Sequence, residues 1–362
     1  MSDVFGKIDG KAWVGLDGFV DKITVPVKKR TGPLTAFTPY ITLTDLGQTI
    51  AAASSTNLNL ELYPKLEKMG GNGPLFANTL ANLGVSVKYV GTLGNPIHPV
   101  FKNFCNNVQA ISLGNYGETD AIECQDGKLI LGKTHALDSI TFENLIAHVP
   151  LDALIQDYSE ASLISWQNWT MTMHMTDILE NILKNIWNKI KNRPDRICFF
   201  DLADPAKRTE NDVLCLLKRL PYFKNKAKVL LGANRSEIQH IGRLLGINFN
   251  ATIPMHDKNY LNLVAHACQK LNIDGLIVHC RDGAVASINN QTAFAPPMKA
   301  KRLTCLTGSG DHFNGGFLSG LLMNLSLEQS LVLAHITSVL YIETGESPTK
   351  EAIQTVFQQY YF

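Results

Sequence analysis

The feature that most constrains the fold of this chain is a repeated alternation of short apolar segments with longer amphipathic ones. The short segments are almost continuously apolar, which is typical of strands buried on both faces of a parallel sheet. We expect strands at Ala12–Leu16, Val85–Val90, Ser162–Trp166, Arg196–Phe200, Lys228–Leu231 and Gly275–His279.

Amphipathic helices are expected between these strands. The clearest runs from Met171 to Ile190, where apolar residues recur at a spacing of 3.6. A second begins at the capping sequence Asn234-Arg235-Ser236-Glu237 and ends at Leu245, and a third covers Lys258–Leu271. This alternation predicts an α/β fold with three layers, in which helices cover both faces of a mostly parallel central sheet.

Two regions interrupt the alternation. Residues 22–65 are rich in Thr, Ser and Pro and show no long helical pattern. Residues 107–134 favour short strands, with Asp126-Gly127 as a hairpin turn between Ala121–Cys124 and Lys128–Leu131. We expect both regions to leave the α/β core and to build a small β-rich lid on a single domain spanning residues 1–362.

Composition excludes several classes of function. The 362 residues are 45% hydrophobic and 18% charged with a net charge of +1, and the densest basic cluster is Lys28-Lys29-Arg30. Such a chain fills a globular core and lacks the basic footprint of a nucleic-acid-binding protein. The seven cysteines are dispersed and form no C-x-x-C pair, and no signal segment or run of 18 apolar residues occurs. We expect a cytoplasmic protein with free thiols and no membrane or nucleic-acid partner.

The segment Thr307–Gly316 is the strongest candidate for chemistry. Gly308, Ser309 and Gly310 form a turn that opens an apolar helix, and Asp311 lies in its first turn. Free N–H groups and the positive end of the helix dipole favour an anion there. A carboxylate beside that anion is placed to take a proton from an attacking hydroxyl, which favours phosphoryl transfer to an alcohol. The alternative is an ordinary helix entry in which Asp311 only favours the dipole.

A second segment of the sequence matches a known phosphate-binding motif. Gly127–Thr134 matches the P-loop pattern G-x-x-x-x-G-K-[ST], with Lys133 as its lysine. However, a P-loop needs a flexible glycine-rich turn, and the four intervening residues Lys-Leu-Ile-Leu favour a strand. A P-loop nucleotidase using Lys133 therefore stays as a less favoured alternative.

Four separated motifs resemble those of the ribokinase-like (phosphofructokinase-B type) carbohydrate kinase family, from Gly15 to about Gly345. They are the glycine-opened helix Gly70–Gly84, the post-strand segment Asp201–Arg208, Asn234–Glu237 and Thr307–Gly316. The resemblance implies a ribokinase-like sandwich with a lid. It also implies a kinase that uses Mg²⁺ and ATP to phosphorylate a hydroxyl, by our expectation a primary one, of a sugar, sugar acid or nucleoside.

The resemblance also implies roles for individual residues. Asp311 matches the catalytic base, and Gly308, Ser309 and Gly310 match the anion hole. Asn234 and Glu237 match an N-x-x-E pair near magnesium and phosphate, where Glu237 would act through water. From the residues alone, these two fit equally well as a helix cap and its capping-box partner.

The sugar pocket is implied by the same resemblance. Asp21 matches an aspartate that binds substrate hydroxyls, and Asp17 is a close rival, although either one also fits a turn. Gly70, Gly71 and Asn72 would line the pocket, where glycine permits close approach of a ligand.

Three departures from the family pattern bear on function. Leu75 replaces a usual Asn of the sugar pocket, and His279-Cys280-Arg281 replaces a usual Thr-x-Gly near the nucleotide. Cys305 replaces an Asp that contributes to a monovalent-cation site, which makes potassium activation doubtful. These departures leave open a binding protein of the same fold that has lost efficient catalysis. Relatives dimerise through the lid, so a homodimer is a further expectation.

Overall fold

The computed structural model describes residues 8, 10–250 and 252–361. Within this part of the chain, a nine-stranded sheet has the order β14-β13-β12-β11-β10-β9-β1-β5-β6. The strands from β12 to β6 pair in parallel, and β13 and β14 are antiparallel additions at one edge. The strands are β1 (Lys11–Leu16), β5 (Ser86–Gly91), β6 (Gln109–Ser112), β9 (Leu163–Trp166), β10 (Ile197–Asp201), β11 (Lys228–Asn234), β12 (Gly275–Cys280), β13 (Gly283–Ile288) and β14 (Gln291–Ala295).

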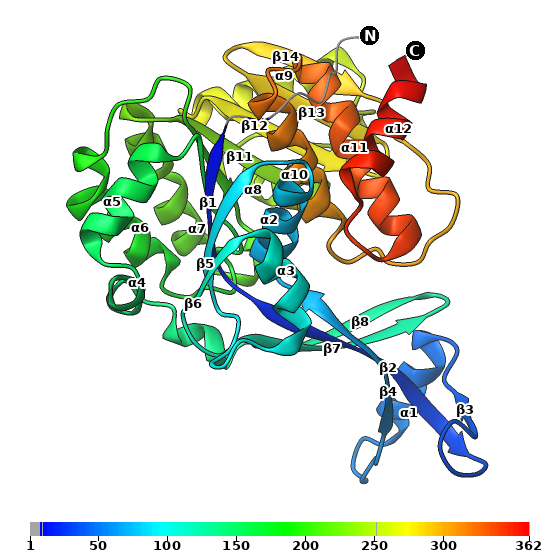
Figure 1. Ribbon diagram of the computed structural model, residues 1–362. Helices are drawn as coiled ribbons and strands as arrows, with labels where there is room; N and C mark the ends of the chain where they lie inside the picture. The colour runs from blue at the N-terminus through cyan, green and yellow to red at the C-terminus, as the bar shows by residue number, and fades with distance from the viewer. Residues whose placement is uncertain (1–7, 9, 251, 362) are drawn as a thin grey trace.

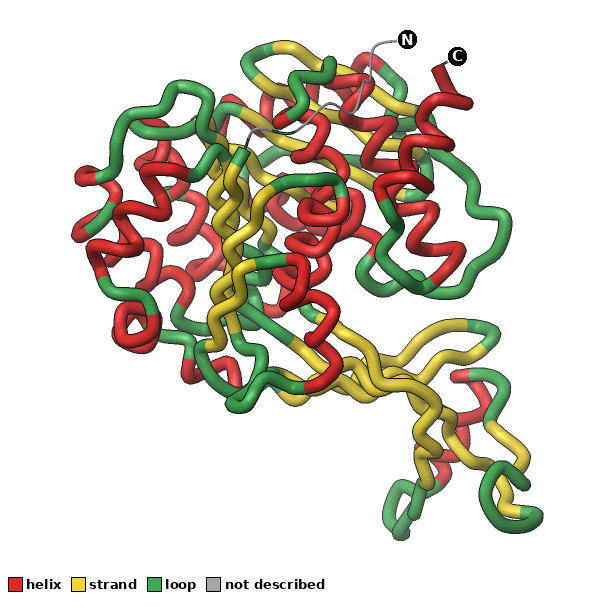
Figure 2. Tube along the Cα trace, in the orientation of Figure 1, coloured by secondary structure: helices red, strands yellow, loops and turns green. Residues whose placement is uncertain are grey.

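Helices cover both faces of this sheet, as Figure 2 shows by the helices on either side of the central strands. One face packs against α4 (Phe142–His148), α5 (Leu151–Glu160), α6 (Met175–Asn185), α7 (Glu210–Leu217), α8 (Arg235–Leu244) and α9 (Lys258–Lys270). The other packs against α2 (Asn72–Asn82), α3 (Lys102–Asn107), α10 (Ser309–Leu322), α11 (Leu327–Thr344) and α12 (Lys350–Tyr361). The predicted three-layer α/β fold is confirmed.

The apolar strands explain why both faces are covered. Successive side chains of a strand point to opposite faces. In β1, Trp13 belongs to the core on one face, whereas Ala12 and Val14 belong to the core on the other. All three are buried, so neither face of this strand is left to solvent.

The strand order reverses at β1. Its parallel neighbours are β5 on one side and β9 on the other, so the chain first builds one half of the sheet and then the other. In open α/β sheets, ligands bind beyond the carboxyl ends of the strands at such a reversal. Asp17 follows β1 at this point, Asn168 follows β9, and Asp201 and Asn234 end β10 and β11.

A second, five-stranded sheet extends away from the α/β body (Figure 1). Strand β2 pairs in parallel with β7 and antiparallel with β3 and β4, and β8 closes a hairpin with β7. These strands are β2 (Phe19–Arg30), β3 (Phe37–Pro39), β4 (Glu61–Gly70), β7 (Gly117–Cys124) and β8 (Gly127–Lys133). The two regions that leave the α/β alternation therefore meet in one sheet, although β2 begins and β4 ends outside residues 22–65. The prediction is wrong for the start of residues 107–134, because β6 pairs with β5 at the edge of the nine-stranded sheet.

Local predictions succeed for the strands and less well for two helices. Each expected strand is present, with ends displaced by up to three residues in the main sheet and up to four in the second sheet. The expected helix Met171–Ile190 is shorter, because α6 begins at Met175 and the chain turns into a 3₁₀ segment at Trp187–Lys189. The region without a long helical pattern contains the ten-residue helix α1 (Leu43–Ala52), whose Leu46 packs beneath the second sheet.

Among the described helices, none combines the length and apolar character needed to cross a bilayer.

Candidate active site

Asp311 lies where two helices begin side by side. Gly308, with a φ of 91°, opens α10, and Asp311 is in the first turn of that helix. Its side chain is 7% exposed, and its Oδ1 accepts a 2.8 Å hydrogen bond from Nδ2 of Asn72, at the start of α2. Burial raises the pKa of Asp311 far above its usual value, and the nearby Asp201 carboxyl adds to the rise. The predicted base and the predicted pocket residue Asn72 are therefore in direct contact.

Asp17 holds the start of α2 in place. Its carboxylate accepts hydrogen bonds from the backbone N–H groups of Asn72 (3.0 Å) and Gly73 (2.8 Å). The Nδ2 of Asn168 donates a third, at 2.7 Å. Asp17 is fully buried, and burial raises its pKa. Its position fixes the helix that carries Asn72, and both of its side-chain oxygens are engaged by the protein.

Asp21 and Gly70 form the neighbouring wall, where β2 and β4 leave the body. A Cβ at Gly70 would lie 2.5 Å from the Asp21 carboxyl, so only glycine fits beside that side chain. Gly71 has a φ of 92° and immediately precedes α2. Burial raises the pKa of Asp21, and the ammonium of Lys68 on the opposed strand position partly offsets this.

Asp201 begins the segment Asp201–Arg208 that the sequence singles out, but no role in the site was predicted for it. Its Oδ2 accepts a 2.7 Å hydrogen bond from Nδ2 of Asn314, and its Oδ1 accepts one of 2.9 Å from the backbone N–H of Ala203. Burial, reinforced by the Glu237 carboxylate, raises the pKa of Asp201 to about 8. Its place as the last residue of a parallel strand was the available signal. Asn168 follows a strand in the same way.

Asn234 and Glu237 form a reciprocal capping box at the start of α8. The Asn234 side chain accepts from the Glu237 backbone N–H, and Oε2 of Glu237 accepts from that of Asn234, at 2.8 Å. The second oxygen of Glu237 accepts from the backbone N–H of Asp204, at 3.0 Å. Burial raises the pKa of Glu237. The capping interpretation is confirmed, and it leaves Glu237 on the same sheet edge as Asp201.

His279 reaches the anion-hole turn from β12. A Cβ at Gly310 would lie 3.2 Å from its Cε1, and its ring stacks on Phe313 at a centroid distance of 4.8 Å. Phe313 in turn contacts the ring of His335 edge-on, at 5.2 Å. Burial lowers the pKa of each histidine to about 4. By contrast, Arg281 is exposed in the turn after β12.

A cavity of about 270 Å³ lies at the far end of this stack of rings. Its lining comes from the segment after β14 and from α11 and α12, and consists of Pro296, Pro297, Met298, Lys299, Val332, His335 and Tyr360. The Nε2 of His335 is buried and has no hydrogen-bond partner within the described part of the protein. A polar atom without a partner beside a cavity is suited to a ligand with a hydrogen-bonding group.

The carboxyls of Asp17, Asp201 and Glu237 raise the pKa of Asp311, and those of Asp17 and Glu237 also raise the pKa of Asp201. Among the described residues, no three such side chains converge closely enough to hold a metal ion by themselves. Mg²⁺ ordinarily takes one or two carboxylates and completes its shell with water and substrate phosphates. Mutually repelling carboxyls at the sheet edge fit such a cation.

The P-loop interpretation is wrong for this chain. Gly127–Lys133 forms β8, a strand paired antiparallel with β7, and it is followed by the short 3₁₀ segment His135–Ser139 rather than by the α-helix that a P-loop opens. The ammonium of Lys133 pairs with Asp120 at 2.8 Å in the second sheet.

The fold of this chain is shared by proteins of known structure. A mostly parallel central sheet covered by helices, with a small second sheet beside it, is the ribokinase-like fold, and solved structures share it. A probable sugar kinase from Rhizobium etli superposes with a TM-score of 0.64 at 17% identity, covering 97% of this chain and 98% of that one. The ribokinase of Arabidopsis thaliana, solved with ribose and ATP, superposes with a TM-score of 0.63 at 14% identity, covering 96% and 98%.

A family model identifies the chain more specifically than the fold does. The model of the prokaryotic ketohexokinase family matches residues 6–360, and the chain belongs to that family. It is 24% identical over 355 residues to a ketohexokinase from Haloferax volcanii, which covers 97% of this chain and 92% of the relative. The protein is thus an ATP-dependent kinase acting on a hydroxyl of a sugar or nucleoside.

Proposed function

We propose that this protein transfers the terminal phosphoryl group of ATP to a primary hydroxyl of a ketohexose, with Asp311 as the catalytic base. The observation that carries the proposal is the position of Asp311. It lies buried in the first turn of α10, oriented by Asn72, next to the glycine turn 308–310, in which the Ser309 N–H donates to the Leu306 carbonyl at 3.3 Å. The choice of a ketohexose rests on the family and on the Haloferax relative.

The chemistry of Asp311 follows from its environment. Its raised pKa makes the carboxylate a strong proton acceptor, while the hydrogen bond from Asn72 favours the ionised form. It would take the proton of the attacking hydroxyl. The backbone N–H groups of residues 308–310 would stabilise charge on the transferring group, an effect typically worth about 3 kcal/mol per donor.

Magnesium and the nucleotide would occupy the edge of the main sheet. Asp201 and Glu237, with Asn234, are the residues we assign to the magnesium region, the carboxylates acting through water. The ion would neutralise phosphate charge. The base of the nucleotide would occupy the cavity beside His335, and the ring stack through Phe313 and His279 ends at Gly310, where the phosphates would lie.

The sugar would lie between the two sheets. Asp21 would accept from its hydroxyls, Gly70 and Gly71 would allow close approach, and Asn72 would contact both sugar and base, with Asp17 holding the helix behind them. The second sheet would act as the lid that excludes water from the phosphoryl group.

A homodimer through that sheet is part of the proposal. Several large apolar side chains on this sheet and on the segments that join its strands are exposed, namely Leu34, Ile41, Ile50, Leu58, Leu66, Ile130 and Leu131. Light scattering after gel filtration tests this, because a monomeric mass at micromolar concentration would contradict it.

The activity is tested with a substrate panel of ketohexoses, aldohexoses, pentoses and nucleosides, each with Mg²⁺ and ATP. We expect a ketohexose to give the highest kcat/KM, and ³¹P–¹³C coupling in the product to place the phosphate on a primary carbon. Preference for a nucleoside would contradict the ketohexose assignment while leaving the kinase chemistry in place.

A further inference from the structure

The turn that opens α10 is held from behind by aromatic side chains. The Oη of Tyr341, on α11, donates to the carbonyl of Thr307 at 2.7 Å. The ring of His312 stacks on Tyr341 at 3.8 Å, and its Nδ1 lies 2.6 Å from the Gly308 carbonyl. Because a carbonyl only accepts, Nδ1 carries the proton. The two carbonyls just before the anion hole are therefore fixed, which orients the N–H groups that follow them.

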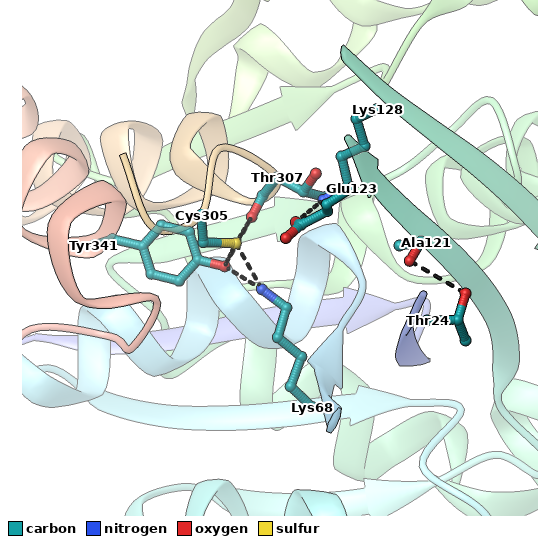
Figure 3. A network of polar contacts seen from close by, with 8 residues as sticks. All are labelled: Thr24, Lys68, Ala121, Glu123, Lys128, Cys305, Thr307 and Tyr341. Carbon is teal, nitrogen blue, oxygen red and sulfur yellow. Dashed lines mark hydrogen bonds and ion pairs between the residues drawn. The ribbon is translucent and has the colours of Figure 1, made fainter. Parts of the chain in front are cut away.

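A cation from the other sheet completes this support. Lys68 lies on β4, and its Nζ is 2.8 Å from the Sγ of Cys305 and 3.0 Å from the Oη of Tyr341 (Figure 3). Since the Tyr341 hydroxyl donates to Thr307, the ammonium must donate to the Tyr341 oxygen. Burial raises the pKa of Tyr341, so the phenol stays protonated.

Lys68 is not used as an ordinary ion-pair partner. Among the described residues, no carboxylate lies within 4.0 Å of its ammonium. Its side chain is half-buried, and Cys305, which it contacts, is 7% exposed. The Asp21 carboxyl, at the paired position of β2, attracts the ammonium from beyond that distance, but a half-buried lysine without a direct carboxylate contact still loses hydration. This unfavourable position of Lys68 indicates that its ammonium has a role that compensates for the lost hydration.

We propose that the Lys68 ammonium is a built-in cation that positions the anion-hole turn and joins it to the second sheet. Through Tyr341 it holds the Thr307 carbonyl, and through Cys305 it holds the preceding residues. The contact links β4, which carries the sugar-side wall, to the turn that faces the phosphoryl group. Lys68 is thus a positioning residue. This inference rests on the proposed role of residues 308–310 as the anion hole.

The structure allows a direct chemical test. A cavity of about 230 Å³ is lined by Lys68, Tyr341, Asn78 and Ser347 among others. Removal of the ammonium in Lys68→Met would leave a site that a small added cation can enter. The matched control is Lys22→Met on β2, since Lys22 is also half-buried but forms an ordinary ion pair with Glu118.

We expect Lys68→Met to lower kcat by about tenfold or more, because misplaced transition-state donors cost rate rather than affinity. KM for ATP should stay within about threefold, since uniform binding is unchanged. Ammonium or potassium chloride should restore several-fold activity to Lys68→Met, relative to choline chloride at equal ionic strength. The parent protein and Lys22→Met should show no such activation.

Several results would overturn the proposal. One is an unchanged kcat in Lys68→Met, and another is an equal loss in Lys22→Met. A loss that no small cation restores, with a thermal midpoint lowered in proportion, would show a merely structural role. Should Lys68→Met fail to fold, Tyr341→Phe provides the second arm. It keeps the ring stacked on His312, and a kcat equal to that of the parent would then contradict the proposal. Loss of activity in Asp311→Asn without any effect at Lys68 would overturn this inference and leave the proposed function intact.

Discussion

At the scale of single residues, the sequence predicts Asp311 as the reacting group but does not predict all of the residues around it. Asp311 could be predicted as the base because the glycine turn and the acidic residue of the first helical turn are adjacent in sequence. Asp201 and Asn168 depend on contacts with Asn314 and Asp17, which lie more than a hundred residues away. Such partners are set by strand order, and no local spacing records them.

The turn itself provides a residue-level prediction. Gly308 has a φ of 91°, and an added Cβ would lie 2.6 Å from Cδ1 of Leu75. Gly308→Ala should lower kcat by about 10- to 100-fold, because the turn must shift to relieve the contact. Gly84 is the control, since it has a φ of 100° and open space around its Cα. Gly84→Ala should cost about 1–2 kcal/mol of stability and leave kcat unchanged. Equal kcat values in the two variants would contradict a catalytic role for the turn.

At the scale of elements, strands were easier to predict than helices. Buried parallel strands are defined by their own apolar runs. Helix α1 was missed although Thr42 caps it locally, and the Asp126 carboxylate adds a distant cap by accepting from the backbone N–H groups of Leu43 and Thr44. The Asp126-Gly127 turn was recognised, but its second role as a cap on α1 is not visible in local sequence.

The cap of α8 leads to an element-level prediction. Asn234→Ala should lower the free energy of unfolding by about 1 kcal/mol, because the Glu237 backbone N–H loses its acceptor. Ser326→Ala is the matched control, since Ser326 forms the same type of capping box at α11. Both should cost similar stability in urea unfolding, but only Asn234→Ala should raise KM for Mg·ATP. Equal KM values in the two variants would restrict Asn234 to capping.

At the scale of the whole molecule, the two sheets meet at the site. The helices and strands of the α/β body bury neutral histidines behind it. Burial lowers the pKa of His335 to about 4. An unfolded chain binds that proton near pH 6.5, so the native state loses stability as pH falls from about 6.5 towards 4. The sequence alone does not show how deeply these histidine rings are buried.

This loss of stability at low pH predicts a measurable difference between the parent protein and a variant without His335. Between pH 6.5 and 5.5, the parent should lose about 1 kcal/mol more stability than His335→Gln, since only the parent has this histidine to protonate on unfolding. Urea unfolding at the two pH values measures it. Identical pH dependence in the two proteins would show that His335 is not held neutral by burial.

The central claim is that Asp311 is the base of a sugar kinase. The most direct test is single-turnover phosphorylation by Asp311→Asn, with sugar and nucleotide binding measured by calorimetry and Lys133→Ala as the control. We predict that Asp311→Asn slows phosphoryl transfer by about 10²-fold or more while both dissociation constants stay within about threefold. Lys133→Ala should retain the parent rate, because Lys133 lies in β8. Near-normal transfer by Asp311→Asn, or loss of transfer in Lys133→Ala, would contradict the account.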